Sequence, residues 1–249
     1  MSIQKFVGII PARGGSKRKP RKNINNFCGK PLIAWTILGA LKSRYLDRVI
    51  ISTDDKETAK IAKRYGAEVP FLRPAELAIP PIGIEPTLKH AYQWLLKNEN
   101  YKADALVLLM PTSPLRQTRH IDEAIEIFKK TKADSVLGVN ETPANHTPFW
   151  TLVRNKKGKV TLWGGKSLKN IITRSQDFPQ KCYARNDLVY ILKPKNLFEK
   201  KSNIYGNKVE LYVISDPSNY EADINTLDDW RDTELKFQKL KRKGTLKIS

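Results

Sequence analysis

Short apolar runs alternate with amphipathic stretches along most of the chain. The strand-like runs cover residues 6–10, 48–52, 68–72, 105–109 and 135–139. Between them, apolar residues recur at helical spacing in 31–43, 56–65, 85–96 and 121–130. Short buried runs that alternate with amphipathic helices are typical of a sheet covered by helices on both faces. The pattern therefore predicts an α/β fold with a mostly parallel, doubly wound, Rossmann-like sheet.

The pattern changes between residues 143 and 186. Short strand-like pieces and the turn sequences NKKGK and WGGK replace the helices there. The alternation then resumes with strands at 188–192 and 209–214 and a final helix at 227–241. We therefore predict two domains: an α/β domain of residues 1–142 and 187–249, and a small β-rich insertion of residues 143–186.

Composition adds a strong positive charge to this picture. The 249 residues include 45 Lys and Arg against 25 Asp and Glu, which gives a net charge of +20. Such a balance favours polyanionic ligands such as nucleotides, sugar acids or nucleic acid, although many of the lysines could serve only solubility. The sequence has no apolar run of membrane-spanning length and no signal-peptide pattern. Cys28 and Cys182 show no metal-ligand spacing, so we expect a protein of the reducing cytoplasm.

The segment IIPARGGSKRKPRKN follows the first predicted strand. Ligands of doubly wound sheets bind beyond the carboxyl ends of the strands, where this loop falls. Gly14 and Gly15 allow backbone N–H groups to turn toward an anion. Arg13 and Lys17 add positive charge, and Ser16 adds a hydroxyl donor. The loop has neither the G-x-x-x-x-G-K-[ST] nor the G-x-G-x-x-G pattern, so it predicts a different kind of triphosphate site. A solubilising surface loop or a nucleic-acid patch is the alternative.

The same loop is similar to the signature of the sialic-acid-type cytidylyltransferases, the CMP-nonulosonate synthetases. Further segments agree with that family in order and spacing: GKPLIAWTI (29–37), ISTDD (51–55), RPAELA (73–78), PTSPLR (111–116), RSQDFPQKCYARN (174–186) and DINTLDD (223–229). The similarity covers nearly the whole chain. It implies a nucleotidyltransferase that moves CMP from CTP to the anomeric hydroxyl of a 2-keto sugar acid of the sialic, legionaminic or pseudaminic type, with release of pyrophosphate.

The resemblance also assigns the nucleotide side of the site. It implies that the triphosphate is bound by Arg13, Gly14, Gly15, Ser16, Lys17, Arg21, Lys22 and Asn23. Arg73, with Ala75 and Ala78, matches the segment that reads the cytosine. Arg13 and Lys17 would stabilise the departing pyrophosphate and are therefore expected to be catalytic.

For the acceptor and the metal, the resemblance implies further residues. The sugar side is assigned to Met110, Pro111, Thr112, Ser113, Arg174 and Gln176. An Arg side chain suits the carboxylate of a sugar acid. Asp223 and Asn225 match the metal-binding D-x-D of the family, which implies Mg²⁺ or Mn²⁺ and makes Asp223 the third catalytic residue. The small insertion of this family packs on a second subunit, so a homodimer is expected.

This chain departs from the family pattern near the acceptor and the metal. Met110 stands where the family usually has Gln, Asn225 stands where it has the second Asp, and the sequence IPPIGIEPT follows RPAELA. A catalytically weakened relative therefore remains an alternative. A second is a Kdo-type cytidylyltransferase, although its loop usually lacks the Gly-Gly-Ser-Lys run. A third is a nucleic-acid-binding protein, but the basic loop contains no aromatic residue to stack on bases. We expect no binding to nucleic acid and no association with membranes.

A few other side chains invite a functional interpretation. His90 and His120 show no metal or triad spacing, and we expect structural roles for them. His146 falls in NHTPFW, where the family places a His near the acceptor. Asp54 and Asp55 follow a predicted strand, and capping of the next helix explains them as well as catalysis does.

Overall fold

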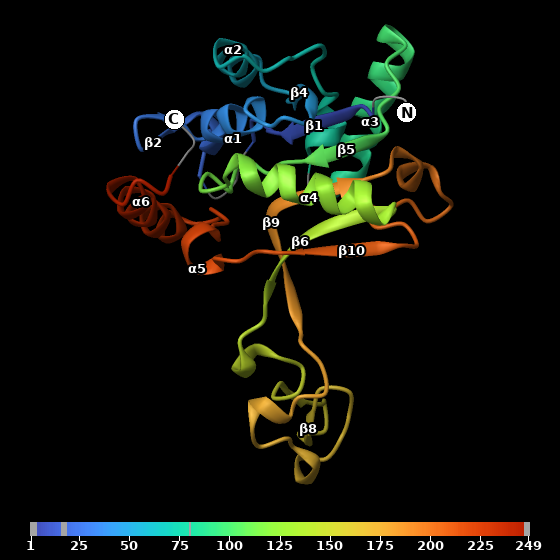
Figure 1. The fold of residues 1–249 in the computed structure, drawn as a ribbon, viewed down its shortest axis with the longest axis vertical. Helices are drawn as coiled ribbons and strands as arrows, with labels where there is room; N and C mark the ends of the chain where they lie inside the picture. Colours follow the sequence, from blue (N-terminus) through green and yellow to red (C-terminus); the bar gives the residue numbers. More distant parts are fainter. Residues whose placement is uncertain (1–3, 16–18, 80, 247–249) are drawn as a thin grey trace. The chain divides into compact units, whose positions relative to one another are not determined.

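The computed structural model describes residues 4–15, 19–79 and 81–246. Within these residues the chain forms a six-stranded sheet in the order β10-β6-β9-β5-β1-β4 (Figure 1). Its strands are β1 (Phe6–Pro11), β4 (Leu46–Ser52), β5 (Ala105–Leu108), β6 (Ser135–Glu141), β9 (Tyr183–Leu192) and β10 (Val209–Val213). β1 pairs in parallel with β4 and β5, whereas β9 pairs antiparallel with β5. The predicted α/β class with a mostly parallel sheet is confirmed.

The helices and the minor strands fall between these strands. The α-helices are α1 (Leu32–Leu41), α2 (Lys56–Arg64), α3 (Ile84–Glu99), α4 (Thr118–Thr131), α5 (Pro217–Tyr220) and α6 (Leu227–Arg242). Single-turn 3₁₀ helices include η1 (Lys22–Ile24), η2 (Ala75–Ala78) and η6 (Pro194–Phe198). Two short antiparallel pairs complete the set: β2 (Asn26–Phe27) with β3 (Lys30–Pro31), and β7 (Leu152–Arg154) with β8 (Val160–Leu162).

The core lies on both faces of the central strands. Ile10 of β1 and Val107 of β5 join one apolar cluster with residues of α1 and α4. Their chain neighbours Ile9 and Leu106 point to the opposite face and are also buried completely. Strands buried on both faces read as continuous apolar runs, which explains why β1 and β5 were recognisable in the sequence.

The predicted strand at 68–72 does not form. Glu68 makes a single parallel bridge to Ile50, and the chain then leaves the sheet. Pro70 lacks the N–H that a longer ladder needs, and Leu72 is exposed. The prediction of a third strand was therefore wrong, and the segment instead carries Arg73 out to the edge of the sheet.

A second apolar cluster lies beneath α6. Phe27, Trp35, Trp230 and Phe237 stack edge to face with ring centroids 4.6–5.7 Å apart. Ile224 is buried completely in the same cluster, and its N–H donates to the carbonyl of Thr112 at 3.1 Å. The residues on either side of Ile224 are therefore held against the loop that follows β5.

The chain divides into two compact units, residues 1–138 with 186–249 and residues 139–185. This division lies near the predicted domain boundaries at 142/143 and 186/187. The small unit contains the β7–β8 hairpin and 3₁₀ turns at 144–146, 168–170 and 175–177, and the residues that the structure describes there include no α-helix. A role for this unit in dimerisation stays a prediction.

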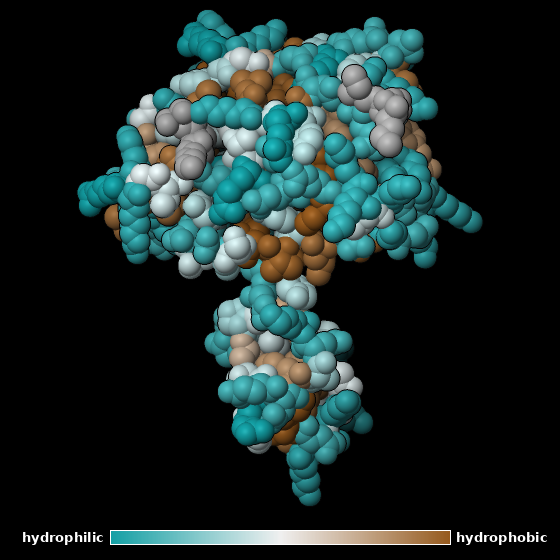
Figure 2. Space-filling view, viewed as in Figure 1, coloured by the Kyte–Doolittle hydropathy of each residue, from teal (hydrophilic) through white to brown (hydrophobic). Residues whose placement is uncertain are grey.

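The visible surface is mostly hydrophilic (Figure 2). This agrees with the large number of lysines in the sequence, many of which contact only solvent. Across the described ranges, no helix has both the length and the apolar character needed to cross a membrane.

Asp55 caps helix α2, and its removal tests the local stability of this region. Its carboxylate accepts hydrogen bonds from the Thr58 N–H at 2.8 Å and the Thr58 hydroxyl at 2.6 Å. Asp55→Ala is expected to lower the free energy of unfolding by about 1 kcal/mol, measured by urea denaturation at neutral pH. Partial burial by itself raises the pKa of Asp55, but the bonds from Thr58 outweigh it and hold the pKa below its ordinary value.

The pH dependence of this cap follows from the lowered pKa. A carboxyl group with a depressed folded-state pKa stabilises the fold above its unfolded pKa, and the stabilisation is lost as pH falls through the folded value. The difference between wild type and Asp55→Ala should therefore shrink below about pH 4. A difference that persists unchanged at lower pH would contradict the capping role.

Candidate active site

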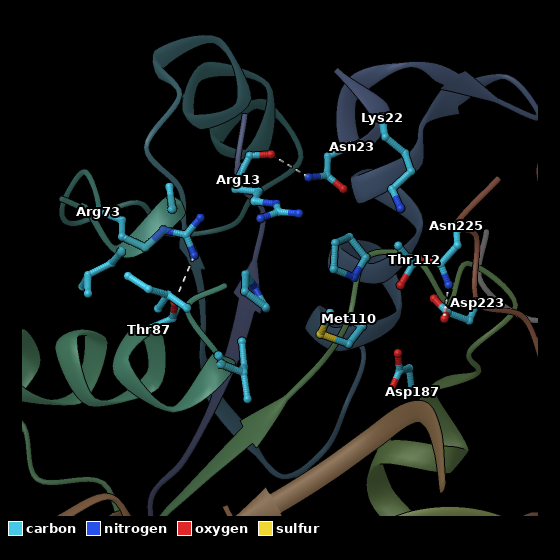
Figure 3. Close-up of a pocket in the computed structure, with 17 residues that line it drawn as sticks. Arg13, Lys22, Asn23, Arg73, Thr87, Met110, Thr112, Asp187, Asp223 and Asn225 are labelled. Atoms are coloured by element: carbon cyan, nitrogen blue, oxygen red, sulfur yellow. Dashed lines mark hydrogen bonds between the residues drawn. The ribbon is translucent and has the colours of Figure 1, made fainter. Parts of the chain in front are cut away.

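A cavity of about 350 Å³ opens beyond the carboxyl ends of β1 and β5 (Figure 3). Its lining comes from distant parts of the large unit: Pro11, Arg13, Lys22, Asn23, Arg73, Leu77, Ala78, Ile82, Gly83, Ile84, Thr87, Met110, Pro111, Thr112, Asp187, Asp223 and Asn225. The position is the one at which open α/β sheets bind their ligands. Cations, carboxylates and an apolar wall meet in this single hollow.

The loop after β1 contributes the cations of the cavity. The Arg13 guanidinium points into the cavity (Figure 3). The backbone carbonyl of Arg13 accepts a hydrogen bond from Asn23 Nδ2 at 3.1 Å. Lys22 Nζ donates to the carbonyl of Ile224. The structure thus brings Arg13, Lys22 and Asn23 to one cavity, and Lys22 joins the loop to the segment of Asp223.

Arg21 is directed elsewhere. It adopts the left-handed conformation, with φ of 58°, at the start of η1, and its guanidinium pairs with Glu57 on α2. Ser16 and Lys17, which the sequence assigned to the triphosphate, lie outside the described residues. The structure therefore does not place Arg21 in the cavity, and the roles of Ser16 and Lys17 stay predictions.

The two glycines of the loop are held differently from the predicted phosphate nest. The N–H of Gly14 donates to Asp54 Oδ1 at 3.1 Å, and Gly14 does not line the cavity. A Cβ atom at this position would lie 2.8 Å from Cβ of Asp55, so only glycine fits. Gly15 has open space around it and also lies outside the lining. Glycine is therefore required at position 14 because the loop packs closely on the turn after β4.

Arg73 is a buried cation at one end of the cavity. Its Nη1 donates to Thr87 Oγ1 at 3.2 Å, and its Nη2 lies 3.4 Å from Asp54 Oδ1. Burial lowers the pKa of Arg73, and the hydrogen bond to Asp54 partly offsets that effect. Its Nε is buried without a hydrogen-bond partner among the residues that the structure describes. Because this N–H is enclosed by protein, a ligand in the cavity would meet other atoms of the Arg73 side chain.

An apolar wall adjoins Arg73. Leu77, Ala78, Ile82 and Ile84 line this part of the cavity. The wall provides a surface on which a flat ring could pack. Ala78 thus lies where the sequence predicted a contact with the base, whereas Ala75 does not line the cavity.

The PTSPLR loop after β5 is split between the cavity and the core. Met110, Pro111 and Thr112 line the cavity. Ser113 is buried completely, and its hydroxyl donates to the carbonyl of Asp187 at 3.0 Å. Ser113 does not line the cavity, and its side chain instead holds the backbone of β9 at Asp187, so its predicted sugar contact stays a prediction.

Arg116 supports the same region from inside the core. Its guanidinium donates to the carbonyls of Met110 at 2.7 Å and Asp187 at 3.2 Å, and to that of Leu188. Complete burial lowers the pKa of Arg116 to about 9. The bonds from this buried guanidinium hold the backbone at Met110 and Asp187, and both of these residues line the cavity.

The carboxylate and amide oxygens that could bind a metal ion in the cavity come from two segments. Asn225 Nδ2 donates to Asp223 Oδ2 at 2.5 Å, which leaves the amide oxygen of Asn225 free of that contact. Asp187, in the middle of β9, adds a second carboxylate that the sequence interpretation missed. Among the described residues, no cluster of three or more His, Cys, Asp or Glu side chains forms a ready metal site. Asp223, Asp187 and Asn225 thus bring two carboxylates and an amide to the cavity, and one oxygen of Asp187 accepts a hydrogen bond from the Tyr190 hydroxyl at 3.1 Å.

Arg174 and Gln176 belong to the small unit. Arg174 is exposed and forms two hydrogen bonds of 2.9 Å with Asp177. Gln176 lines a separate cavity of about 650 Å³ within residues 139–185, together with Thr147 and Phe178. His146 is exposed beside this region. The sugar contacts predicted for Arg174 and Gln176 stay predictions.

The remaining histidines are structural, as predicted. His120 is buried completely, and its Nδ1 accepts a hydrogen bond from the Gln117 N–H at 3.2 Å, which caps α4. Burial lowers the pKa of His120 to about 3, so its ring is neutral at physiological pH. His90 packs against Phe71, and burial lowers its pKa as well.

An α/β sheet with a basic, partly apolar cavity beyond its parallel strands defines a protein of the nucleotide-binding class. A family model described as Cytidylyltransferase matches residues 7–237. The chain belongs to the cytidylyltransferase family, which confirms the resemblance seen in the sequence.

Relatives of known description share most of their length with this chain. It is 34% identical to the CMP-N,N'-diacetyllegionaminic acid synthase of Legionella pneumophila, over 92% of this chain and 95% of that protein. It is 33% identical to a pseudaminic acid cytidylyltransferase of Campylobacter jejuni, over 95% of both chains. A solved CMP:2-keto-3-deoxy-manno-octonic acid synthetase in complex with CTP superposes with a TM-score of 0.67, at 16% identity, over 95% of this chain and 99% of that one. At that identity the structural similarity establishes the fold alone.

Proposed function

We propose that this cytidylyltransferase transfers CMP from CTP to the anomeric hydroxyl of a nonulosonic acid and releases pyrophosphate. The observation that carries the proposal is the single cavity in which Arg13 and Lys22 face Asp223 and adjoin an apolar wall. Phosphoryl and nucleotidyl transfer depend mainly on positioning and on neutralising charge, and these residues supply both. The sugar acids named in the descriptions of the relatives support the acceptor class.

The cavity suggests how CTP lies in it. The triphosphate would contact Arg13 and Lys22, with Ser16 and Lys17 completing the loop. The cytosine would pack on the apolar wall beside Arg73. In this arrangement Arg13 and Lys17 stabilise the charge of the departing pyrophosphate.

The oxygen donors fit a hard divalent cation. Mg²⁺ and Mn²⁺ prefer carboxylate and amide oxygens, and Asp223, Asp187 and the amide oxygen of Asn225 line the same cavity. We propose that these residues hold the ion together with phosphate oxygens. When bound, such an ion neutralises phosphate charge and lowers the pKa of an attacking hydroxyl.

The acceptor would enter beside Met110, Pro111 and Thr112. The thioether of Met110 forms only weak hydrogen bonds, so this part of the pocket selects by shape more than by polar contacts. We further propose that the small unit supplies Arg174 and Gln176 to the acceptor and joins two chains in a homodimer. A cytoplasmic location is supported by the free thiols of Cys28 and Cys182.

A pyrophosphate-release assay tests the function. CTP and Mg²⁺ are supplied with a panel of sialic, legionaminic and pseudaminic acids and an eight-carbon 2-keto sugar acid. We expect pyrophosphate and a CMP-sugar with at least one nine-carbon acid, and none without an acceptor or with UTP in place of CTP. Release with the eight-carbon acid alone would instead indicate a Kdo-type enzyme. No release with any acid, combined with RNA binding that weakens steeply with salt, would favour a nucleic-acid-binding protein.

A further inference from the structure

The turn that follows β4 touches two parts of the candidate site. Thr53, Asp54 and Asp55 connect β4 to α2. On one side of this turn lies Gly14 of the loop after β1, and on the other side lies Arg73. These three segments are far apart in the sequence, and the turn is where they meet.

Asp54 makes both contacts with one oxygen atom. Its Oδ1 accepts from the Gly14 N–H at 3.1 Å and lies 3.4 Å from Arg73 Nη2. The side chain of Arg73 is only 4% exposed, whereas that of Asp54 is 23% exposed. A buried guanidinium is costly without a partner, and Asp54 is the carboxylate with which it forms an ion pair.

The main chain around Asp54 is held by other bonds. The Arg73 N–H donates to the carbonyl of Thr53 at 2.8 Å, and the Ala12 N–H donates to the carbonyl of Ser52 at 2.9 Å. These backbone bonds do not involve the Asp54 side chain. Its removal therefore frees the Gly14 N–H and the Nη2 of Arg73 while the strands stay paired, and the Arg73 guanidinium keeps its bond from Nη1 to Thr87.

We infer that Asp54 is a positioning residue that fixes the phosphate loop and the base-reading arginine relative to each other. This inference rests on the proposed function for its consequence in catalysis. Gly14 adjoins Arg13, which faces the triphosphate, and Arg73 faces the base. Binding of the triphosphate and binding of the base then both depend on the Asp54 carboxylate, which does not itself line the cavity.

The neighbouring Asp55 provides a matched control. It is the same residue type in the same turn, but its carboxylate is committed to Thr58 as the cap of α2. Asp55→Ala should affect helix stability alone. Asp54→Ala should affect the two segments that Asp54 joins. Asp54→Asn provides a second variant, because it keeps an oxygen acceptor for Gly14 but loses the charge that balances Arg73.

Hydrogen–deuterium exchange of the nucleotide-free protein tests the structural part. In Asp54→Ala we expect faster exchange both in the peptide containing Gly14 and in the peptide containing Arg73, whereas Asp55→Ala should change only the start of α2. Asp54→Asn should change the Arg73 peptide more than the Gly14 peptide. Faster exchange in neither peptide of Asp54→Ala, or in one of them alone, would overturn the inference.

Kinetics test the consequence for catalysis. We expect Asp54→Ala to raise the KM for CTP about tenfold or more, with the KM for the sugar acid close to that of wild type. A general loss of folded enzyme would instead lower kcat and leave both KM values unchanged. If the wild type releases no pyrophosphate while the exchange result holds, the proposed function fails and the link made by Asp54 stands. An unchanged KM for CTP in an active Asp54→Ala enzyme would reject the positioning role.

Discussion

Replacing Asp223 with alanine is expected to lower kcat/KM for CTP by about three orders of magnitude or more. Asp223 lines the cavity as an exposed carboxylate, and it accepts a hydrogen bond from the amide of Asn225. The loss removes the negative charge through which the site would hold a divalent cation. Steady-state rates of pyrophosphate release, measured over a range of Mg²⁺ concentrations, provide the test. We expect the variant to need more Mg²⁺ for half of its maximal rate.

The fold should tolerate this change. Ala222 and Ile224 flank Asp223 and anchor the segment in the second apolar cluster, so the carboxylate is not needed for packing. Asp228→Ala is a matched control on the same segment, because its side chain is 86% exposed and its ion-pair partner is Arg231. Exposed pairs of this kind contribute little to stability. A rate for Asp223→Ala close to that of Asp228→Ala would contradict the assigned role.

The sequence predicted the central strands well because they are buried on both faces. Continuous apolar runs such as 105–109 leave few alternatives to a strand in a covered sheet. The run at 68–72 is less uniform, because it contains Glu68 and Pro70, and Pro70 stops the ladder after Glu68. The apolar residues of this run alone therefore overestimated how much of it pairs in the sheet.

Strand direction explains why Asp187 was missed. A residue that precedes a parallel strand lies at the edge opposite the ligand, so the predicted strand at 188–192 placed Asp187 away from the site. In the structure β9 runs antiparallel to β5, with Tyr190 opposite Leu108. The middle of β9, which includes Asp187, therefore lies near the carboxyl end of β5, and Asp187 lines the same cavity as Met110. Direction is a property of tertiary pairing, and no local pattern in the sequence encodes it.

Similar reasoning applies to Gly14 and Ser113. Both lie in motifs that the sequence assigned to ligand binding, and both make their hydrogen bonds to other protein groups. A Gly or Ser in a binding motif can serve either a ligand or the packing that supports it. Only the contacts with Asp54 and Asp187, which are distant in the sequence, distinguish the two roles.

Lys22→Met should reduce kcat/KM for CTP by about two orders of magnitude, because it removes a cation from the proposed triphosphate site while keeping most of the side-chain volume. The Lys22 ammonium also donates to the carbonyl of Ile224, so its loss additionally loosens the contact between the basic loop and the segment of Asp223. Lys22→Arg keeps the charge and should recover part of the rate.

A neighbouring lysine separates this effect from a general loss of positive charge. Lys30 has its Nζ 5.4 Å from the centre of the Trp35 ring and does not line the cavity. Lys30→Met lowers the net charge by the same amount, so any long-range attraction of CTP changes equally in the two variants. We therefore expect Lys30→Met to stay within about twofold of wild type at 0.15 M salt, where the Debye length is about 8 Å. Equal losses in Lys22→Met and Lys30→Met would show that overall charge, and not the position of Lys22 in the cavity, governs the binding of CTP.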